Sequence, residues 1–266
     1  MHMNEKEAYR YLEETFVATF LDELIPGIFH NFANPLNGIM GRSKLMQRRL
    51  NHFIEQTAAC NPEMQKEVDE SGRKLLSDIN SINDEAEKFY ELFRVSTGKF
   101  YAIGAHHRDR LNLSSLVEAE MGFVDFYLDF KHHIKKDVRI DHDMPDISGI
   151  TAFYSMALWA LIRQSIKCIT DADLQTFMIA TGHDDQWVSV TIKPIGGGLL
   201  GGWRDFISDA MTGGGMLQNV PDVQKDLFYA LLLLKKGSAG VEIMHEGEAE
   251  TLTVKVPRHH NKKEVS

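Results

Sequence analysis

The sequence predicts an α+β protein that begins with an antiparallel pair of long helices and continues into a domain of alternating helices and strands. Apolar residues repeat every seven positions over residues 21–46 and again over residues 68–93, which is the period of helices that pack along a common seam. Beyond residue 108, apolar helical segments follow short alternating segments, a pattern typical of helices packed on a sheet.

Two apolar rows define the first helical segment. They are Leu21, Ile28 and Pro35 in one row and Ile25, Phe32, Ile39 and Met46 in the other. His30 lies two residues from both Ile28 and Phe32, and at about 100° per residue this turns its imidazole roughly 200° away from the seam. We therefore expect the His30 ring to face water.

A second helical segment follows a turn expected at Cys60-Asn61-Pro62. Its apolar rows are Val68, Leu75, Ile82 and Phe89, and Gly72, Ile79, Ala86 and Phe93. Two such helices form an antiparallel hairpin. Because a lone hairpin cannot cover both seams, we expect two copies of the chain to pair into a four-helix bundle around a two-fold axis. The sequence thus predicts a homodimer.

One segment of the first helix resembles the phosphoacceptor box of sensor histidine kinases and related histidine phosphotransferases. It reads His30-Asn31-x-x-Asn34-Pro35-Leu36-x-x-Ile39-x-Gly41, and the family pattern is His-Glu-x-x-Asn-Pro-Leu. The family kinks its helix just after the acceptor histidine, which accounts for a proline at this place. The resemblance implies that His30 accepts a phosphoryl group. The plainer alternative is an exposed helix histidine followed by a proline that merely bends the helix.

The same family carries an ATP-binding sandwich, a mixed sheet with helices on one face, after its hairpin. The order of elements here fits that domain, with helices expected at 111–117, 150–169 and 228–234 and strands at 138–140, 187–192, 240–243 and 251–256. We expect a dimerisation and phosphoacceptor hairpin at residues 1–100, a degenerate ATP-binding domain at 108–257 and a C-terminal tail at 258–266.

Most nucleotide-binding residues of that family are replaced in this chain. Gln164 lies where the family holds Mg²⁺ with an asparagine, and its longer arm suits octahedral Mg²⁺ poorly. Lys167 matches a family lysine that can reach phosphate. Pro194 replaces the aspartate that accepts the adenine amine. The junction directly before the helix at Phe228, residues 222–227, has no glycine to let backbone N–H groups wrap a triphosphate. Gln164 and Lys167 are therefore the candidate residues of a degenerate nucleotide site, and ATP-dependent activity is doubtful.

The acceptor box also departs from the family pattern. Asn31 cannot take the imidazole proton as the usual acid does during attack on ATP. Asn34 lies one helical turn beyond His30 on the same face, where the family uses an amide or hydroxyl to position a water or the reacting groups of a receiver. Transfer to and from a receiver aspartate is thus compatible with these residues, whereas self-phosphorylation from ATP is weakened.

The resulting interpretation is a two-component phosphorelay protein that passes phosphate through His30 between response-regulator receiver domains. No intrinsic cofactor is expected, because in a relay the receiver supplies Mg²⁺ and a lysine. Two alternatives remain open. One is an active or residually active sensor histidine kinase core that phosphorylates His30 from ATP, and the other is a non-enzymatic dimeric adaptor.

Composition narrows the remaining possibilities. The 266 residues are 43% hydrophobic, enough for two modest cores, and the net charge of -9 argues against a nucleic-acid partner. Cys60 and Cys168 are far apart and lack metal-ligand spacing, so no metal site and a reducing cytoplasm are expected. No signal peptide and no apolar run of about 18 residues is present, so no membrane partner is expected.

Overall fold

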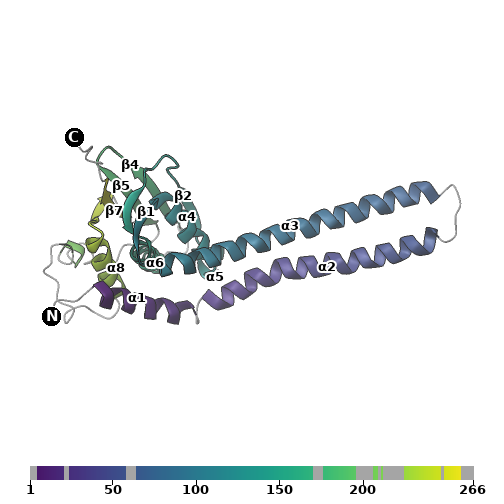
Figure 1. The fold of residues 1–266 in the computed structure, drawn as a ribbon, viewed down its shortest axis with the longest axis horizontal. Coiled ribbons are helices and arrows are strands. Elements are labelled where there is room, and N and C mark those ends of the chain that lie inside the picture. The colour runs from purple at the N-terminus through teal and green to yellow at the C-terminus, as the bar shows by residue number, and fades with distance from the viewer. Residues whose placement is uncertain are drawn as a thin grey trace. The chain divides into compact units, whose positions relative to one another are not determined.

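The computed structural model divides the chain into two compact units. The hairpin unit is Ile25–Thr97, and the sandwich unit combines Met1–Leu24 with Gly98–Ser266. Figure 1 labels the elements of both. The structure describes residues 5–20, 24–57, 64–169, 176–195, 206–208, 211, 225–246 and 249–258.

The hairpin unit consists of two long antiparallel helices, as the heptads predict. Helix α2 spans Ile25–Thr57, and α3 spans Met64–Gly104, so α3 continues past the hairpin unit into the sandwich unit (Figure 1). Pro35 lies inside α2 without ending it. The expected turn residues at 60–62 lie outside the described residues.

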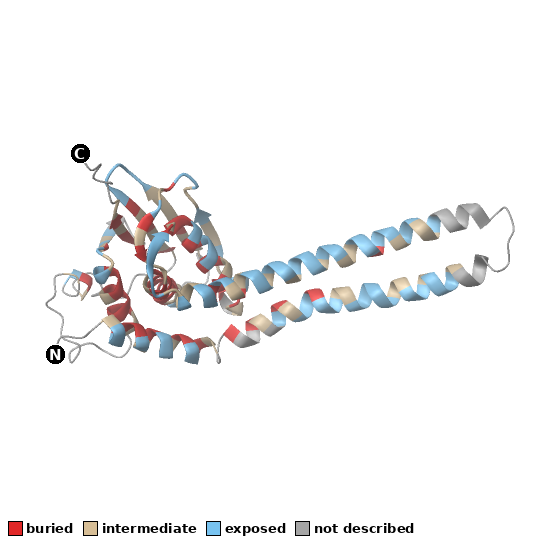
Figure 2. Cartoon of the chain, viewed as in Figure 1, coloured by how far each residue is buried: buried red, intermediate tan, exposed pale blue. Residues whose placement is uncertain are grey.

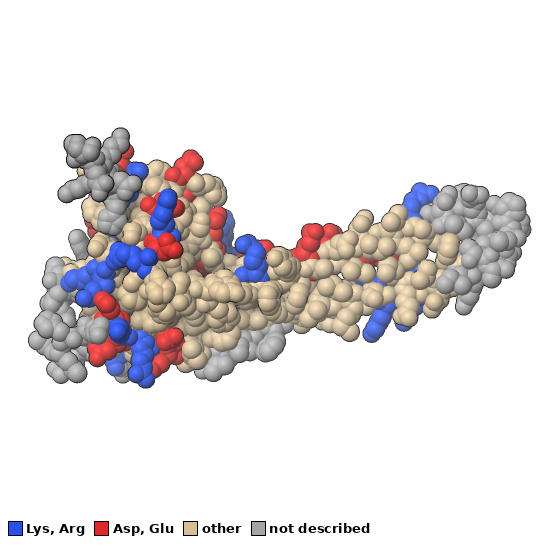
Figure 3. Space-filling view, viewed as in Figure 1, with Lys and Arg blue, Asp and Glu red and all other residues tan. Residues whose placement is uncertain are grey.

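One apolar row of α3 is closed within the hairpin and the other is open. Leu75, Ile82 and Phe89 are half-buried, and the Phe89 ring packs edge-on against Phe32 with the centroids 5.1 Å apart. In the second row, Ile79 is 39% exposed and Phe93 is 54% exposed. Figure 3 shows that part of the visible hairpin surface bears no charged side chain. The hairpin therefore leaves an apolar surface uncovered within the chain.

A mixed five-stranded sheet forms one layer of the sandwich unit. The strand order is β2-β4-β5-β7-β6, in which β2 and β4 are parallel and the other neighbours are antiparallel. A separate pair, β1 with β3, is antiparallel. The strands are β1 (Arg108–Leu111), β2 (Lys135–Arg139), β3 (Ile147–Ile150), β4 (Thr176–His183), β5 (Trp187–Ile195), β6 (Gly240–Glu246) and β7 (Ala249–Pro257).

Helices cover one face of this sheet. Strand register places Ile179, Ile192 and Leu252 side by side, and all three are fully buried, whereas the alternating residues of β5 are only half-buried. Figure 2 shows buried residues concentrated where the helices meet the sheet. The helices of this region are α4 (Leu113–Val124), α5 (Leu128–His133), α6 (Thr151–Lys167) and α8 (Lys225–Lys236). The predicted α+β class and mixed sheet are confirmed.

The first helix, α1 (Glu5–Thr19), lies in the sandwich unit and not in the hairpin. It packs on α6 and α8, where the Phe16 ring meets Trp159 edge-on at 5.2 Å and Tyr11 stacks on Tyr229 at 4.1 Å. Leu12 is also fully buried. The sandwich unit therefore gains a third layer of helix on the outer side of α6 and α8.

The division of the chain differs from the expected hairpin boundary of residues 1–100. The buried residues of α1 pack on α6 and α8, so residues 1–24 belong to the sandwich unit. The hairpin unit ends at Thr97, and the rest of α3 also belongs to the sandwich unit. Apart from Arg258, the expected tail at 258–266 lies outside the described residues. None of the described helices combines the length and the apolar character needed to cross a membrane.

Candidate functional site

His30 is exposed on α2, in agreement with the heptad pattern. Asn34 is exposed one helical turn further along, so the imidazole and this amide share a solvent-facing side of the helix. Pro35, a member of the first seam row, is buried. The helix thus presents a nucleophile and a neutral hydrogen-bonding group next to each other, which suits a reaction with a partner that arrives from solution.

Asn31 does not share that side. It is only 4% exposed, because a residue next to His30 is turned by about 100° toward the interior of the hairpin unit. The family residue at this place is an acid that takes the imidazole proton. An amide in this buried position has neither the chemistry nor the access for that role.

Polar contacts that the sequence did not reveal join the two helices of the hairpin. Asp78 is 2% exposed and accepts hydrogen bonds from Arg49 and, at 3.5 Å, from Arg42. A side chain at Gly38 would meet Glu85 Cγ at 3.0 Å, so glycine permits the close approach of the two helices. Asp78 lies three residues after the inner-row Leu75, and this spacing was the available signal.

The two candidate nucleotide residues lie on α6 and are placed differently. Gln164 is 8% exposed, whereas Lys167 is exposed in the last turn of the helix. Near them, Asp226 of α8 accepts a hydrogen bond from Arg163 at 3.4 Å. Burial raises the pKa of Asp226, while the charges of Arg163 and Lys167 and a hydrogen bond from Tyr11 of α1 oppose the shift. The charge of Lys167 therefore partly offsets the effect of burial on the pKa of Asp226.

Two of the substituted positions can be compared with what an adenine nucleotide would need. Pro194 is buried in β5, where it pairs with Phe177, and its side chain offers no acceptor for an exocyclic amine. Gln164 has little exposed surface with which to hold a hydrated Mg²⁺. Of the glycine-free junction at residues 222–227, residues 225–227 form the start of α8 and residues 222–224 lie outside the described residues.

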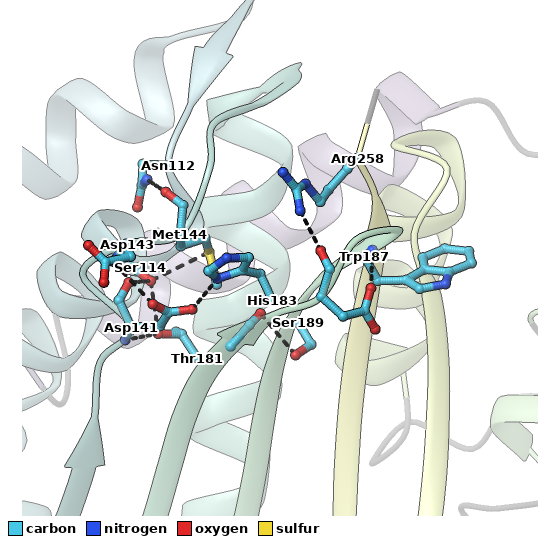
Figure 4. Close-up of polar contacts among 12 residues, drawn as sticks. Asn112, Ser114, Asp141, Asp143, Met144, Thr181, His183, Trp187, Ser189 and Arg258 are labelled. Atoms are coloured by element: carbon cyan, nitrogen blue, oxygen red, sulfur yellow. Dashed lines mark hydrogen bonds and ion pairs between the residues drawn. The ribbon is translucent and has the colours of Figure 1, made fainter. Parts of the chain in front are cut away.

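A second polar cluster, shown in Figure 4, ties the connection between β2 and β3 to the end of β4. Ser114 Oγ donates to the Asp141 carbonyl at 2.7 Å, and the Asp141 N–H donates to Thr181 Oγ1 at 2.8 Å. His183 Nδ1 lies 2.5 Å from Asp141 Oδ2 and holds the pKa of that carboxyl below its usual range. Because every polar group of Asp141 is used within the fold, we interpret this cluster as structural.

No set of three or more His, Cys, Asp or Glu side chains is grouped to hold a metal ion in the part of the chain that the structure describes. Cys168 is buried and its thiol lies 3.2 Å from the Gln164 carbonyl. The other cysteine, Cys60, lies outside the described residues.

No protein-family model and no curated protein matches the sequence. Among solved structures, the chain is similar to the histidine kinase AdeS of Acinetobacter baumannii, with 13% identity over 82% of this chain and 96% of that one and a TM-score of 0.45. It is also similar to a histidine kinase of Burkholderia phymatum, with 13% identity, coverage of 82% and 97% and a TM-score of 0.40. A bacterial phosphotransferase gives 10% identity, coverage of 87% and 93% and a TM-score of 0.38.

At such identities the similarity concerns the arrangement of helices and strands. A helical hairpin with an exposed histidine is followed along the chain by a mixed sheet with helices on one face. In this arrangement of elements the chain resembles a sensor histidine kinase core.

Proposed function

We propose that this protein is a histidine phosphotransferase of two-component signalling, which relays phosphoryl groups through His30 between receiver-domain aspartates. The observation that supports it is the pairing of an exposed His30 with an exposed Asn34 on a helix whose described seam residues are buried or half-buried. The described nucleotide region adds support, because Pro194 and Gln164 do not suit ATP and Mg²⁺.

In the proposed reaction, the unprotonated nitrogen of the His30 imidazole attacks the phosphorus of an aspartyl phosphate in line. An N–P bond forms, the P–O bond to the aspartate breaks, and the carboxylate leaves. The receiver supplies the Mg²⁺ and lysine that neutralise charge on the moving group. Asn34 donates its amide N–H toward a phosphoryl oxygen or a bound water. The reverse reaction passes the group from His30 to a second receiver.

The proposal includes a homodimer in a reducing cytoplasm. The open apolar row at Ile79 and Phe93 needs a cover, and a second hairpin of the same kind offers a matching row. The cytoplasmic assignment follows from the chain's cysteine usage, since its two cysteines, Cys60 and Cys168, lie far apart in sequence and lack metal-ligand spacing.

The deciding experiment offers the purified chain two phosphoryl donors in parallel. One is radiolabelled ATP with Mg²⁺, and the other is a set of prephosphorylated receiver domains. We expect label from receivers only, lost in His30→Gln and kept in His52→Gln, a control that changes an exposed histidine of the same helix. Loss of the nucleophile should lower labelling by at least about a thousandfold, because no other group can form the N–P bond.

The other outcomes identify the alternatives. Label from ATP that disappears in His30→Gln would establish a histidine kinase. Absence of label from both donors, with receiver binding unchanged in His30→Gln, would contradict the relay and establish the adaptor.

A further inference from the structure

A buried ion pair lies at the end of α3, directly after the hairpin unit. Lys99 Nζ lies 2.7 Å and 2.8 Å from the two carboxylate oxygens of Glu120 on α4, and it donates to Ser155 Oγ on α6 at 2.8 Å. Ser155 Oγ in turn donates to Glu120 at 2.5 Å. The side chains of Lys99 and Glu120 are each 1% exposed. We call Lys99, Glu120 and Ser155 the stem cluster.

Aromatic rings enclose the stem cluster. The ring centroids of Phe16 and Phe123 lie 5.5 Å and 5.9 Å from Lys99 Nζ. These rings exclude water from the pair, and burial lowers the pKa of Lys99 while the Glu120 carboxylate opposes the shift. The cluster thus joins three helices by hydrogen bonds, and the Phe16 ring adds a contact from a fourth helix, α1.

Stability does not explain such a pair. Removing two charges from water costs several kcal/mol per ion, and apolar side chains of similar volume are often as stable or more stable in the same place. The best-attested role of a buried polar contact is to specify one register, since a shifted arrangement would leave a charge buried without its partner. A register role requires that the cluster hold a helix whose position along its axis affects the rest of the protein.

The cluster meets that requirement because residues close to both ends of the hairpin unit pack next to it. The chain enters α2 after Phe20 and the fully buried Leu24, and it leaves the hairpin unit at Gly98. Phe20 packs edge-on against Phe100 at 5.4 Å, and it stacks on Phe16, whose ring lies over Lys99. The segments before and after the hairpin are therefore packed against each other within the sandwich unit.

We propose that the stem cluster is a register device, in which Lys99 is a positioning residue that fixes the axial position and rotation of α3 and so aligns α3 with the helix that carries His30. A slip of α3 by one turn, about 5.4 Å, would withdraw Lys99 from Glu120 and Ser155. The part of this inference that concerns phosphoryl transfer rests on the proposed function, whereas the part that concerns register does not.

The test replaces the pair by apolar residues in Lys99→Met/Glu120→Leu. The control, Glu91→Gln/Arg94→Gln, removes an ion pair of the same helix whose side chains are 54% and 65% exposed. Register is read by oxidative cross-linking in full-length chains with Cys60 and Cys168 replaced by Ser. One cysteine pair takes the place of Phe32 and Phe89, which are in contact, and the other takes the place of Phe32 and Phe93, one turn further along α3.

We expect the melting temperature of the apolar variant to be equal to or above that of the parent. The ratio of in-register to shifted cross-links should nevertheless fall at least about threefold, and relay through His30 should slow about tenfold, because misaligned helices place the reacting groups poorly. The control should change neither quantity. An unchanged cross-link ratio in the apolar variant overturns the proposal.

The two readouts separate this inference from the proposed function. A changed cross-link ratio supports the register device even if the parent chain relays no phosphate. If the apolar variant does not fold, Ser155→Ala, which removes a single hydroxyl from the cluster, replaces it. A lowered cross-link ratio in Ser155→Ala supports the device and an unchanged ratio overturns it.

Discussion

At the scale of single residues, burial separates three side chains that the acceptor motif places close together. His30 and Asn34 are exposed, whereas Asn31 is buried, so only two of the three predicted site residues face solvent. The spacing of one helical turn accounts for the shared side, and the change of about 100° per residue accounts for the separation. Their chemical roles stay predictions until phosphoryl transfer is measured.

Asp78 joins the two helices of the hairpin, so its substitution tests how much these polar contacts stabilise the hairpin unit. Asp78→Ala should lower the free energy of unfolding of the hairpin unit by about 2 kcal/mol, because its hydrogen bonds from Arg49 and Arg42 join charged groups. The loss stays this small because both arginines are partly exposed and regain water. Urea unfolding monitored by circular dichroism measures it.

Asp84→Ala provides the comparison, since Asp84 is an exposed aspartate of the same helix. It should change the free energy of unfolding by less than about 0.5 kcal/mol. Equal effects of the two substitutions would show that the Asp78 contacts contribute nothing specific to the hairpin.

At the scale of elements, residues 5–19 fell within the expected hairpin boundary of residues 1–100, but the helix α1 that they form lies in the sandwich unit. Its apolar residues repeat as in any amphipathic helix, and that pattern does not reveal which surface covers them. The Phe16 ring meets Trp159, Phe123 and the Lys99 ammonium, which come from α6, α4 and α3. These partners lie far away along the chain, so local periodicity could not identify them.

The α1 assignment predicts which unit loses stability when the helix is damaged. Phe16→Ala should lower the free energy of unfolding of the sandwich unit by about 3–5 kcal/mol, because Phe16 is only 1% exposed and removing its ring leaves a cavity in the core. Differential scanning calorimetry and hydrogen exchange of β5 and β7 measure the effect.

Val17→Ala is the matched control, since the adjacent Val17 is 50% exposed. It should leave the sandwich unit within about 0.5 kcal/mol of the parent. If Phe16→Ala instead accelerates hydrogen exchange in the hairpin unit alone, α1 would belong with the hairpin after all.

At the scale of the whole molecule, the open apolar row of α3 links the fold to the expected homodimer. Ile79 and Phe93 are exposed within one chain although they continue a seven-residue repeat. Soluble chains rarely leave such a row uncovered, and a two-fold related copy brings an identical row to it.

A charge placed in this row should therefore weaken self-association. Phe93→Glu should raise the dissociation constant of the homodimer at least about a hundredfold, since it puts two carboxylates into one desolvated interface. Sedimentation velocity measures it. Asn80→Glu adds the same charge at an exposed position of the same helix outside the two apolar rows and should have no effect. A parent chain that sediments as a monomer would contradict the expected bundle.

The sequence by itself determined the hairpin, the exposed side of His30 and several helices and strands of the sandwich unit, because each of these follows from periodicities within a single segment. It did not predict β1, β3, β4 or α5. The sequence also predicts that Pro194 and Gln164 suit ATP and Mg²⁺ poorly, and this stays a prediction until nucleotide binding is measured.

Only the tertiary structure decided that α1 covers α6 and α8, that Asn31 is buried and that Lys99 pairs with Glu120 and Ser155. The physical reason is that burial and pairing depend on which surfaces meet after the chain has folded, and residues far apart in sequence make those surfaces. A lysine near the end of an amphipathic helix reads as a solvated charge until the helices that enclose it are in place.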